Sequence, residues 1–167
     1  MAITVYNPDG IETIENTRFV WVPSIADIDA PMVTEIDAGT EFTCAMTEFT
    51  PGSDASESDD KRICRRDVAK RPGPVTYTLD DLTLIVEDPQ AEDPFIDSLE
   101  PGVQGFIVEF PNIAPGTATA AAQKAHVYKV TVKTKTPGKI STDDGEMFTM
   151  IIGWSVQKRS LKAAVAA

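Results

Sequence analysis

The sequence predicts a mainly β protein: a β-sandwich or half-barrel of two packed sheets, with one short flanking α-helix, a long acidic loop and extended terminal arms. Three observations lead to this fold class. Apolar residues recur with the two-residue period of strands along much of the chain. Only one stretch has both the composition and the end signals of a helix. The 167 residues, 42% of them hydrophobic, suffice for one domain with a substantial core.

Five segments carry the strand pattern. Phe19–Val22 is a short apolar run that Pro23 closes. Between residues 75 and 87 the apolar positions change from odd to even numbers, which predicts one long strand with a bulge or a bend at Asp80–Asp81. The other strands are expected at residues 103–110, 126–135 and 147–157. The last has apolar side chains on both faces, so either its own domain buries both or a neighbouring subunit covers one.

Residues 89–100 are predicted to form the helix, because acidic residues occupy its first turn and Pro101 and Gly102 follow it. Residues 117–123 are rich in alanine and fit either a turn of helix or a loop. The first 18 residues and residues 158–167 are interpreted as an N-terminal arm and a C-terminal tail, because neither shows a pattern for packing within the chain. Such arms are disordered or dock on partners.

The most informative segment is a long loop, expected at residues 47–61. Residues 47–60 contain five acidic side chains, no base and few groups to bury, whereas six bases follow within residues 61–71. Hairpin loops usually need only about 2–5 residues. We therefore expect a loop that is disordered in the free subunit and binds another copy, its acids pairing with that copy's bases. The expected contact residues are Glu48, Phe49, Asp54, Glu57, Asp59, Asp60, Arg62, Arg65 and Arg66.

The net charge of −11 is distributed in blocks along the chain. Residues 1–60 hold 13 acids and one base, and residues 72–123 hold nine acids and no base. Residues 61–71 and 124–167 are each net positive. Overall acidity argues against a protein that grips nucleic acid tightly, because that requires basic clusters on phosphate. Blocks of opposite sign suit head-to-tail self-association, unless they mix in space.

No catalytic, cofactor or metal site is predicted. The single histidine, His126, lies in a strand, where an edge or amphipathic position explains it. Neighbouring carboxylates such as Asp80–Asp81 and Asp143–Asp144 point to opposite faces of an extended chain and make poor catalytic pairs. The acidic loop lacks the spacing and the glycine of a calcium-binding EF-hand loop.

The sequence shows no signal peptide and no apolar run near the ~20 residues of a membrane helix. We therefore expect a chain that is made and kept in a cytoplasm and has no membrane contact. Cys44 and Cys64 could form a disulfide if their segments pair as antiparallel strands. The alternative, two reduced thiols in the core, is favoured by a reducing compartment.

The order of the motifs is that of a known family. The chain runs through Trp21-Val-Pro23, Asp29-Ala-Pro31, the stretch from Glu35 to Cys44, an acidic loop, Asp60-Lys-Arg-Ile-Cys64, a long strand, and a helix after Pro89. This order resembles the major tail tube proteins of long, non-contractile-tailed (siphovirus-type) phages, particularly those that infect actinobacteria. The resemblance covers most of the chain.

The resemblance implies a structural virion protein that is not an enzyme and needs no cofactor. It implies that six copies form a ring and that rings stack into a tail tube, through which DNA passes to the host with weak, non-specific contact. The implied partners are other copies, the tape measure protein, the tail tip and the terminator. The implied location is the phage tail, after assembly in the bacterial cytoplasm.

Two other classes of protein stay open. The first is another β protein of the virion, such as a tail terminator or a capsid decoration protein. The second is a small adhesion or carbohydrate-binding β-sandwich. Proteins of that second class normally expose aromatic residues on loops, whereas Trp21 and Trp154 both lie in strand-like runs.

Overall fold

The computed structural model describes residues 10–61, 63–64, 66, 68–140 and 147–167. Within these ranges the chain forms one large antiparallel sheet and one two-stranded ladder. The strands of the large sheet are β1 (Thr17–Val22), β2 (Thr40–Glu41), β5 (Leu82–Ile85), β6 (Gln104–Pro111), β7 (Lys124–Pro137) and β8 (Thr149–Ala164). The ladder consists of β3 (Pro51–Asp60) and β4 (Ala69–Leu79).

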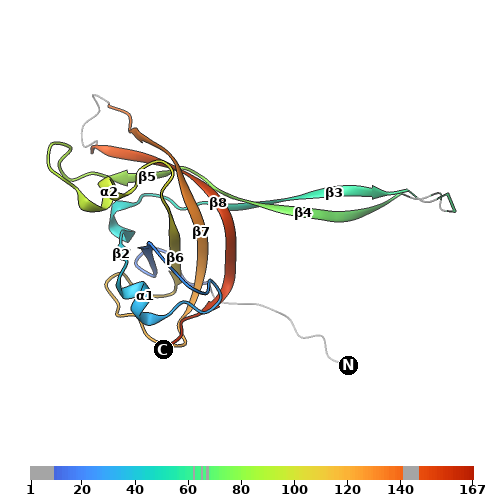
Figure 1. The fold of residues 1–167 in the computed structure, drawn as a ribbon, viewed down its shortest axis with the longest axis horizontal. Coiled ribbons are helices and arrows are strands. Elements are labelled where there is room, and N and C mark those ends of the chain that lie inside the picture. Colours follow the sequence, from blue (N-terminus) through green and yellow to red (C-terminus); the bar gives the residue numbers. More distant parts are fainter. Residues whose placement is uncertain (1–9, 62, 65, 67, 141–146) are drawn as a thin grey trace.

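The large sheet has the order β2-β1-β6-β7-β8-β5 and curls into a half-barrel (Figure 1). The β3–β4 ladder extends away from it as a long arm. The predicted mainly β class, with a half-barrel and a short flanking helix, is thus confirmed. The second, smaller sheet of the protein is this arm.

Both faces of the half-barrel are covered, which explains why its central strands are apolar at successive positions. Phe19 and Trp21 of β1 point into a first core, and Val20 and Val22 point into a second core on the other face. The first core also contains Ile107, Tyr128, Val130, Val132, Leu82, Leu84, Ile152 and Trp154. The second also contains Ile25, Ile28, Phe106, Val108, Phe110, Val127, Ala163 and Val165.

Two short helices cover the two cores. Helix α2 (Pro94–Ser98) places Ile96 in the first core, and its N-cap Asp93 accepts hydrogen bonds from the backbone N–H groups of Phe95 and Ile96, both at 3.0 Å. The helix predicted at residues 89–100 is therefore present but shorter, because Pro94 fixes its first turn.

Helix α1 (Val33–Asp37), which the sequence analysis missed, places Ile36 in the second core. The carboxylate of Glu35 accepts hydrogen bonds from the backbone N–H groups of Met32 and Ala26, both at 2.9 Å. A helix of five residues leaves too short an apolar period to be recognised.

The long strand predicted at residues 75–87 is wrong. Strand β4 ends at Leu79 and β5 begins at Leu82, and the two belong to different sheets. The change from odd to even apolar positions at Asp80–Asp81 therefore marks a boundary between two strands, because each strand packs its own face on the domain.

The C-terminal segment is part of the domain, so the prediction of a tail without packing partners at residues 158–167 is wrong. Strand β8 continues to Ala164, and Val165 is buried. The backbone N–H of Val165 donates to Gln123 O at 2.9 Å, and that of Ala166 donates to Pro31 O at 2.8 Å. Residues 117–123 form turns and loop. Of the predicted N-terminal arm, residues 1–9 lie outside the described residues and residues 17–18 begin β1.

Trp21 and Trp154 lie against each other in the first core, with ring centroids 5.5 Å apart, and both are buried. Gly105 of β6 lies directly under Trp21. A Cβ atom added at this glycine would lie 2.4 Å from Cζ2 of the indole. The tryptophan pair therefore depends on a residue without a side chain at position 105.

We expect Gly105→Ala to lower the free energy of unfolding by about 1–3 kcal/mol, because Trp21 must shift within a packed core. Urea unfolding followed by tryptophan fluorescence measures this change. Gly10→Ala is the matched control, because a Cβ at Gly10 meets nothing within 4 Å. Equal stability of the two variants would contradict the proposed contact.

Candidate functional site

The arm (residues 51–79) is the part of the molecule with the least packing of its own. Its two strands pair from Pro51 opposite Leu79 to Asp60 opposite Ala69. At about 3.3 Å per residue, the ten residues of β3 span roughly 33 Å. Among the arm's described side chains only Leu79, at the domain end, is buried. The arm therefore extends into solvent beyond its root (Figure 1).

The root of the arm is fixed to the domain by aromatic contacts. The guanidinium carbon of Arg159, on β8, lies 4.3 Å from the centroid of the Tyr77 ring. Phe49 packs its ring 4.7 Å from that of Phe19 and 5.4 Å from that of Tyr128. The first core thus holds the chain just before β3, and β8 holds the end of β4.

The structure places a strand over most of the segment where a disordered loop was predicted. Residues 51–60 gain backbone hydrogen bonds from β4, which the sequence analysis had assigned in part to the domain. Strand pairing satisfies backbone N–H and C=O groups without burying side chains, so an acidic segment can adopt it. The role of this segment in contacts between subunits stays a prediction.

Charges of opposite sign meet within the arm itself. Glu57 forms an ion pair with Lys70 and Asp60 forms one with Arg71, each at 2.7 Å across the two strands. Asp59 lies 3.6 Å from Lys61. Part of the complementarity that was expected between copies is therefore used inside one copy.

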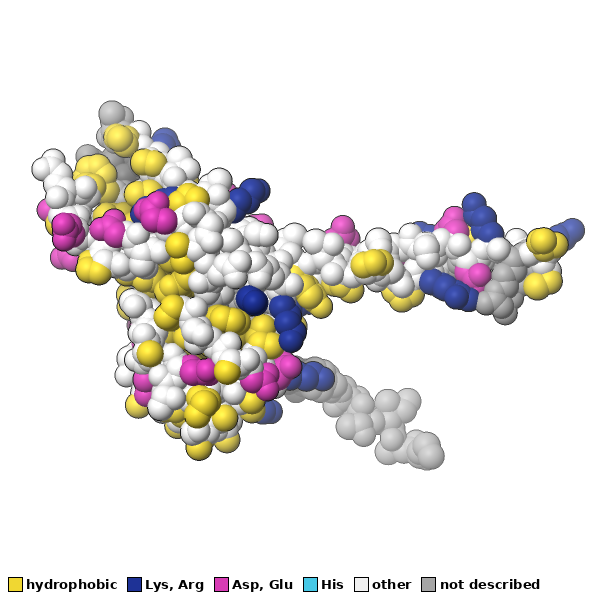
Figure 2. All heavy atoms as spheres, in the orientation of Figure 1, with side chains coloured by type: hydrophobic (Ala, Val, Ile, Leu, Met, Phe, Trp, Pro, Cys, Tyr) yellow, Lys and Arg dark blue, Asp and Glu magenta, His cyan; other side chains and the backbone are white. Residues whose placement is uncertain are grey.

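The tip of the arm (residues 61–68) is apolar and basic. Ile63 is fully exposed and Val68 is 53% exposed. Lys61, Cys64 and Arg66 are exposed as well. Hydrophobic and basic side chains accordingly gather at the far end of the arm (Figure 2). The predicted contact residues Arg62 and Arg65 belong to the tip by sequence but lie outside the described residues.

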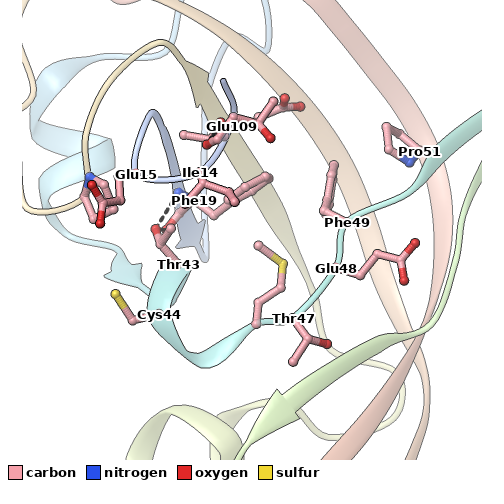
Figure 3. Close-up of a pocket in the computed structure, with 14 residues that line it drawn as sticks. Ile14, Glu15, Phe19, Thr43, Cys44, Thr47, Glu48, Phe49, Pro51 and Glu109 are labelled. Atoms are coloured by element: carbon pink, nitrogen blue, oxygen red, sulfur yellow. Dashed lines mark hydrogen bonds between the residues drawn. The ribbon is translucent and has the colours of Figure 1, made fainter. Parts of the chain in front are cut away.

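A hollow of about 560 Å³ lies at the root of the arm (Figure 3). We call it the base pocket. It is lined by Thr13, Ile14, Glu15, Thr17, Phe19, Thr43, Cys44, Met46, Thr47, Glu48, Phe49, Pro51, Glu109 and Pro115. Phe19, Met46 and Phe49 supply apolar walls, and three carboxylates accompany them. None of the lining residues is basic.

One carboxylate of the base pocket is tied to a buried tyrosine. The hydroxyl of Tyr128 donates a hydrogen bond to Glu109 at 3.0 Å, and Nδ1 of His126 lies 3.2 Å from the same oxygen. Burial raises the pKa of the Tyr128 phenol well above its usual value, and the negative charge of Glu109 raises it further.

Cys44 and Cys64 are both free and exposed, so the prediction of two core thiols is wrong. Cys44 lies in the 3-10 turn η1 (Thr43–Ala45) and lines the base pocket, whereas Cys64 lies at the tip. The β3–β4 ladder separates them because it begins after Cys44 and ends before Cys64. The two segments do not pair as the disulfide prediction required.

The predicted contact residues fall into three groups. Asp54, Glu57, Asp59 and Asp60 lie on β3, and Arg66 lies at the tip. Glu48 and Phe49 line the base pocket. Sequence reasoning missed Ile14, Phe19 and Glu109 as pocket residues, because the pocket is assembled from segments far apart in the chain.

The described part of the chain holds neither a metal-binding cluster nor a membrane-spanning helix. No group of three or more His, Cys, Asp or Glu side chains there is arranged to hold a metal ion. None of the described helices has the length and apolar character needed to cross a membrane.

The tyrosine–carboxylate contact predicts how stability depends on pH. The folded state keeps the Tyr128 proton to a higher pH than the unfolded state, in which the phenol titrates near 10.0. The stabilisation is therefore complete below about pH 10 and is lost as the pH rises further. We expect the wild type to lose stability more steeply than Tyr128→Phe between about pH 10 and 11. Urea unfolding at each pH tests this, and parallel curves would contradict it.

Known proteins resemble this chain both in sequence and in fold. Residues 7–167 match a family model described as "Phage tail tube protein". Among solved structures, a chain in the cryo-EM structure of the anti-feeding prophage (AFP) baseplate, 6-fold symmetrised, shares the fold with a TM-score of 0.52 and 8% sequence identity. That match covers 95% of this chain and 98% of the other. No curated protein sequence gives a significant match. Because the family model spans nearly the whole chain, this protein belongs to the phage tail tube protein family and is a structural protein of the phage tail.

Proposed function

We propose that this protein polymerises as stacked hexameric rings into the tail tube of a siphovirus-type phage with an actinobacterial host, and that DNA passes through the tube during delivery. The single observation that carries the proposal is the arm. It reaches roughly 33 Å from a well-packed domain and, among its described residues, buries only Leu79.

An arm of this kind gains from contact with another molecule. A two-stranded ribbon is at best marginally stable in water, because most of its backbone hydrogen bonds are exposed to solvent. Contact with a second copy removes the ribbon from water on one face. Since the arm and the surface that receives it differ, the contact is head-to-tail and repeats from copy to copy.

Contacts within a ring require a second, larger surface. Obligate interfaces typically bury about 2,000 Å² or more and are rich in apolar side chains. Met147 and Phe148, which precede β8, are 59% and 57% exposed, and Ile140 is 84% exposed. These side chains lie outside both cores and supply apolar area for a neighbour in the same ring.

Passage of DNA requires that the inner surface of the tube does not bind the phosphate groups of the DNA backbone. The net charge of −11 favours such weak, non-specific contact, because acidic side chains repel the backbone of DNA. The tape measure protein, the tail tip and the terminator are the partners that complete such a tail.

Shortening the arm tests the proposal. Ser53 and Tyr77 are directly opposite each other, so residues 54–76 can be replaced by Asn-Gly as a two-residue hairpin turn. The shortened protein keeps Tyr77 beneath Arg159 and Leu79 in the core. We expect it to fold with a thermal midpoint within a few degrees of the wild type, because the removed residues bury almost nothing.

Electron microscopy measures the result. The wild type is expected to form tubes of uniform diameter at high concentration or on a template, whereas the shortened protein is not. Class averages of tube ends should show sixfold rings. A wild type that stays monomeric under all these conditions, or a shortened protein that still forms tubes, would overturn the proposal.

A further inference from the structure

We infer that the tip of one copy's arm inserts into the base pocket of a second copy, with Ile63 against its aromatic wall and the basic residues against its carboxylates. This inference rests on the proposed function and deepens it, because it names the surface that receives the arm. Three properties of the tip and the pocket support it: their charge, their exposed apolar side chains and their positions.

The charges of the two surfaces are complementary. Glu15, Glu48 and Glu109 are the charged side chains among the lining residues of the base pocket. Among the described tip residues, Lys61 and Arg66 are basic and exposed, and none is acidic. Three acids of the arm already have cationic partners within the same arm. In the base pocket, Glu15 and Glu48 line the open hollow, whereas Glu109 already contacts Tyr128 and His126.

The apolar surfaces also match. Ile63 presents its whole side chain to water, and the pocket offers the rings of Phe19 and Phe49 with Met46 beside them. Ile14, which is 77% exposed, extends this apolar wall at the N-terminal side. The hollow has the size of sites that hold small ligands, so it has room for an isoleucine side chain and its neighbours.

The geometry requires two copies. The β3–β4 ladder keeps each tip roughly 33 Å from its own base pocket, so no copy can fill its own pocket. Every copy therefore gives one tip and receives another, which produces an open head-to-tail series. Copies joined in this way, if they keep nearly the same orientation, are separated by about the length of the arm.

Two native cysteines can be used to detect this contact. Cys44 lines the base pocket and Cys64 follows Ile63 in the tip, and both thiols are free and exposed. Within one copy the ladder holds them apart. Insertion of the tip brings Cys64 of one copy next to Cys44 of the second, so an oxidant can join the two copies by a disulfide.

The experiment is oxidation of assembled wild-type tubes with diamide. Each disulfide releases two thiol protons and two electrons, which reduce the N=N bond of diamide to a hydrazine. Because every copy has both thiols, denaturing gels without reductant should show a ladder of dimers, trimers and longer chains. Cys44→Ser and Cys64→Ser tubes should each give monomers only. Tubes mixed from the two variants should give dimers and nothing longer.

A matched control moves the thiol along the arm. In the double variant Cys64→Ser, Thr76→Cys, the cysteine lies on exposed β4 near the root, not at the tip. Tubes of this variant should stay monomeric on the same gel. Crosslinking equal to that of the wild type would show that the tip has no preferred position.

Other outcomes overturn the inference while leaving the proposed function intact. Visible tubes that yield no ladder would show that the tip docks elsewhere. Dimers from Cys44→Ser tubes would show that tips meet tips. Failure to form any tube would instead count against the proposed function. In a tube reconstruction, a separation of about 60 Å between copies joined by an arm would put the pocket out of reach of a ribbon of roughly 33 Å.

Discussion

The antiparallel ladder between β7 and β8 is the feature on which the rest of the structure depends. Three register shifts along it bend both strands, and this curls the sheet into a half-barrel. One end of β8 pairs with β5. Just beyond its other end, Ala166 forms backbone hydrogen bonds with Pro31 and Val33, at the start of α1. Arg159, near the middle of β8, packs over Tyr77 and so holds the root of the arm. The direction of the arm is therefore set by the same strand that closes both cores.

An ion pair between a buried arginine and a half-buried glutamate fixes the wall of the base pocket. Arg18 is 8% exposed, lies over the ring of Phe110 and donates to Glu41 at 2.8 Å. Glu41 also accepts a hydrogen bond from the backbone N–H of Gly116 at 2.9 Å. A buried charge of this kind is tolerated only when its polar atoms find partners. The contact joins β1, β2 and the loop after β6, which brings Pro115 and Phe19 to the same hollow.

Sequence reasoning located the strands that have a strong apolar period. It failed for segments whose strand pairing rests on backbone hydrogen bonds without such a period. The strands at 19–22, 103–110 and 126–135 were predicted within a few residues, because each packs alternating side chains on a core. Strand β3 is predicted as a loop, since Pro51–Asp60 has almost no apolar side chains and pairs only through its backbone. The tail was missed for a similar reason: small alanines give no period, although Ala163 is fully buried. Of the pocket, Cys44, Glu48 and Phe49 were singled out, but Glu109 comes from a distant strand.

The composition of the arm explains why its contacts should concentrate at its ends. A two-stranded ribbon has two open edges, and such edges recruit other strands unless something prevents it. Pro72 and Pro74 remove two backbone donors from β4, and a bulge between Ala55 and Glu57 interrupts the ladder opposite them. Charged pairs lie between this bulge and the tip. Edge-to-edge pairing is thus disfavoured along the ribbon, while apolar side chains remain at the tip and at the root. An arm that binds through its end can do so in one register only, and a repeating assembly requires a single register. Two ribbons that pair edge to edge can slip past each other by whole residues.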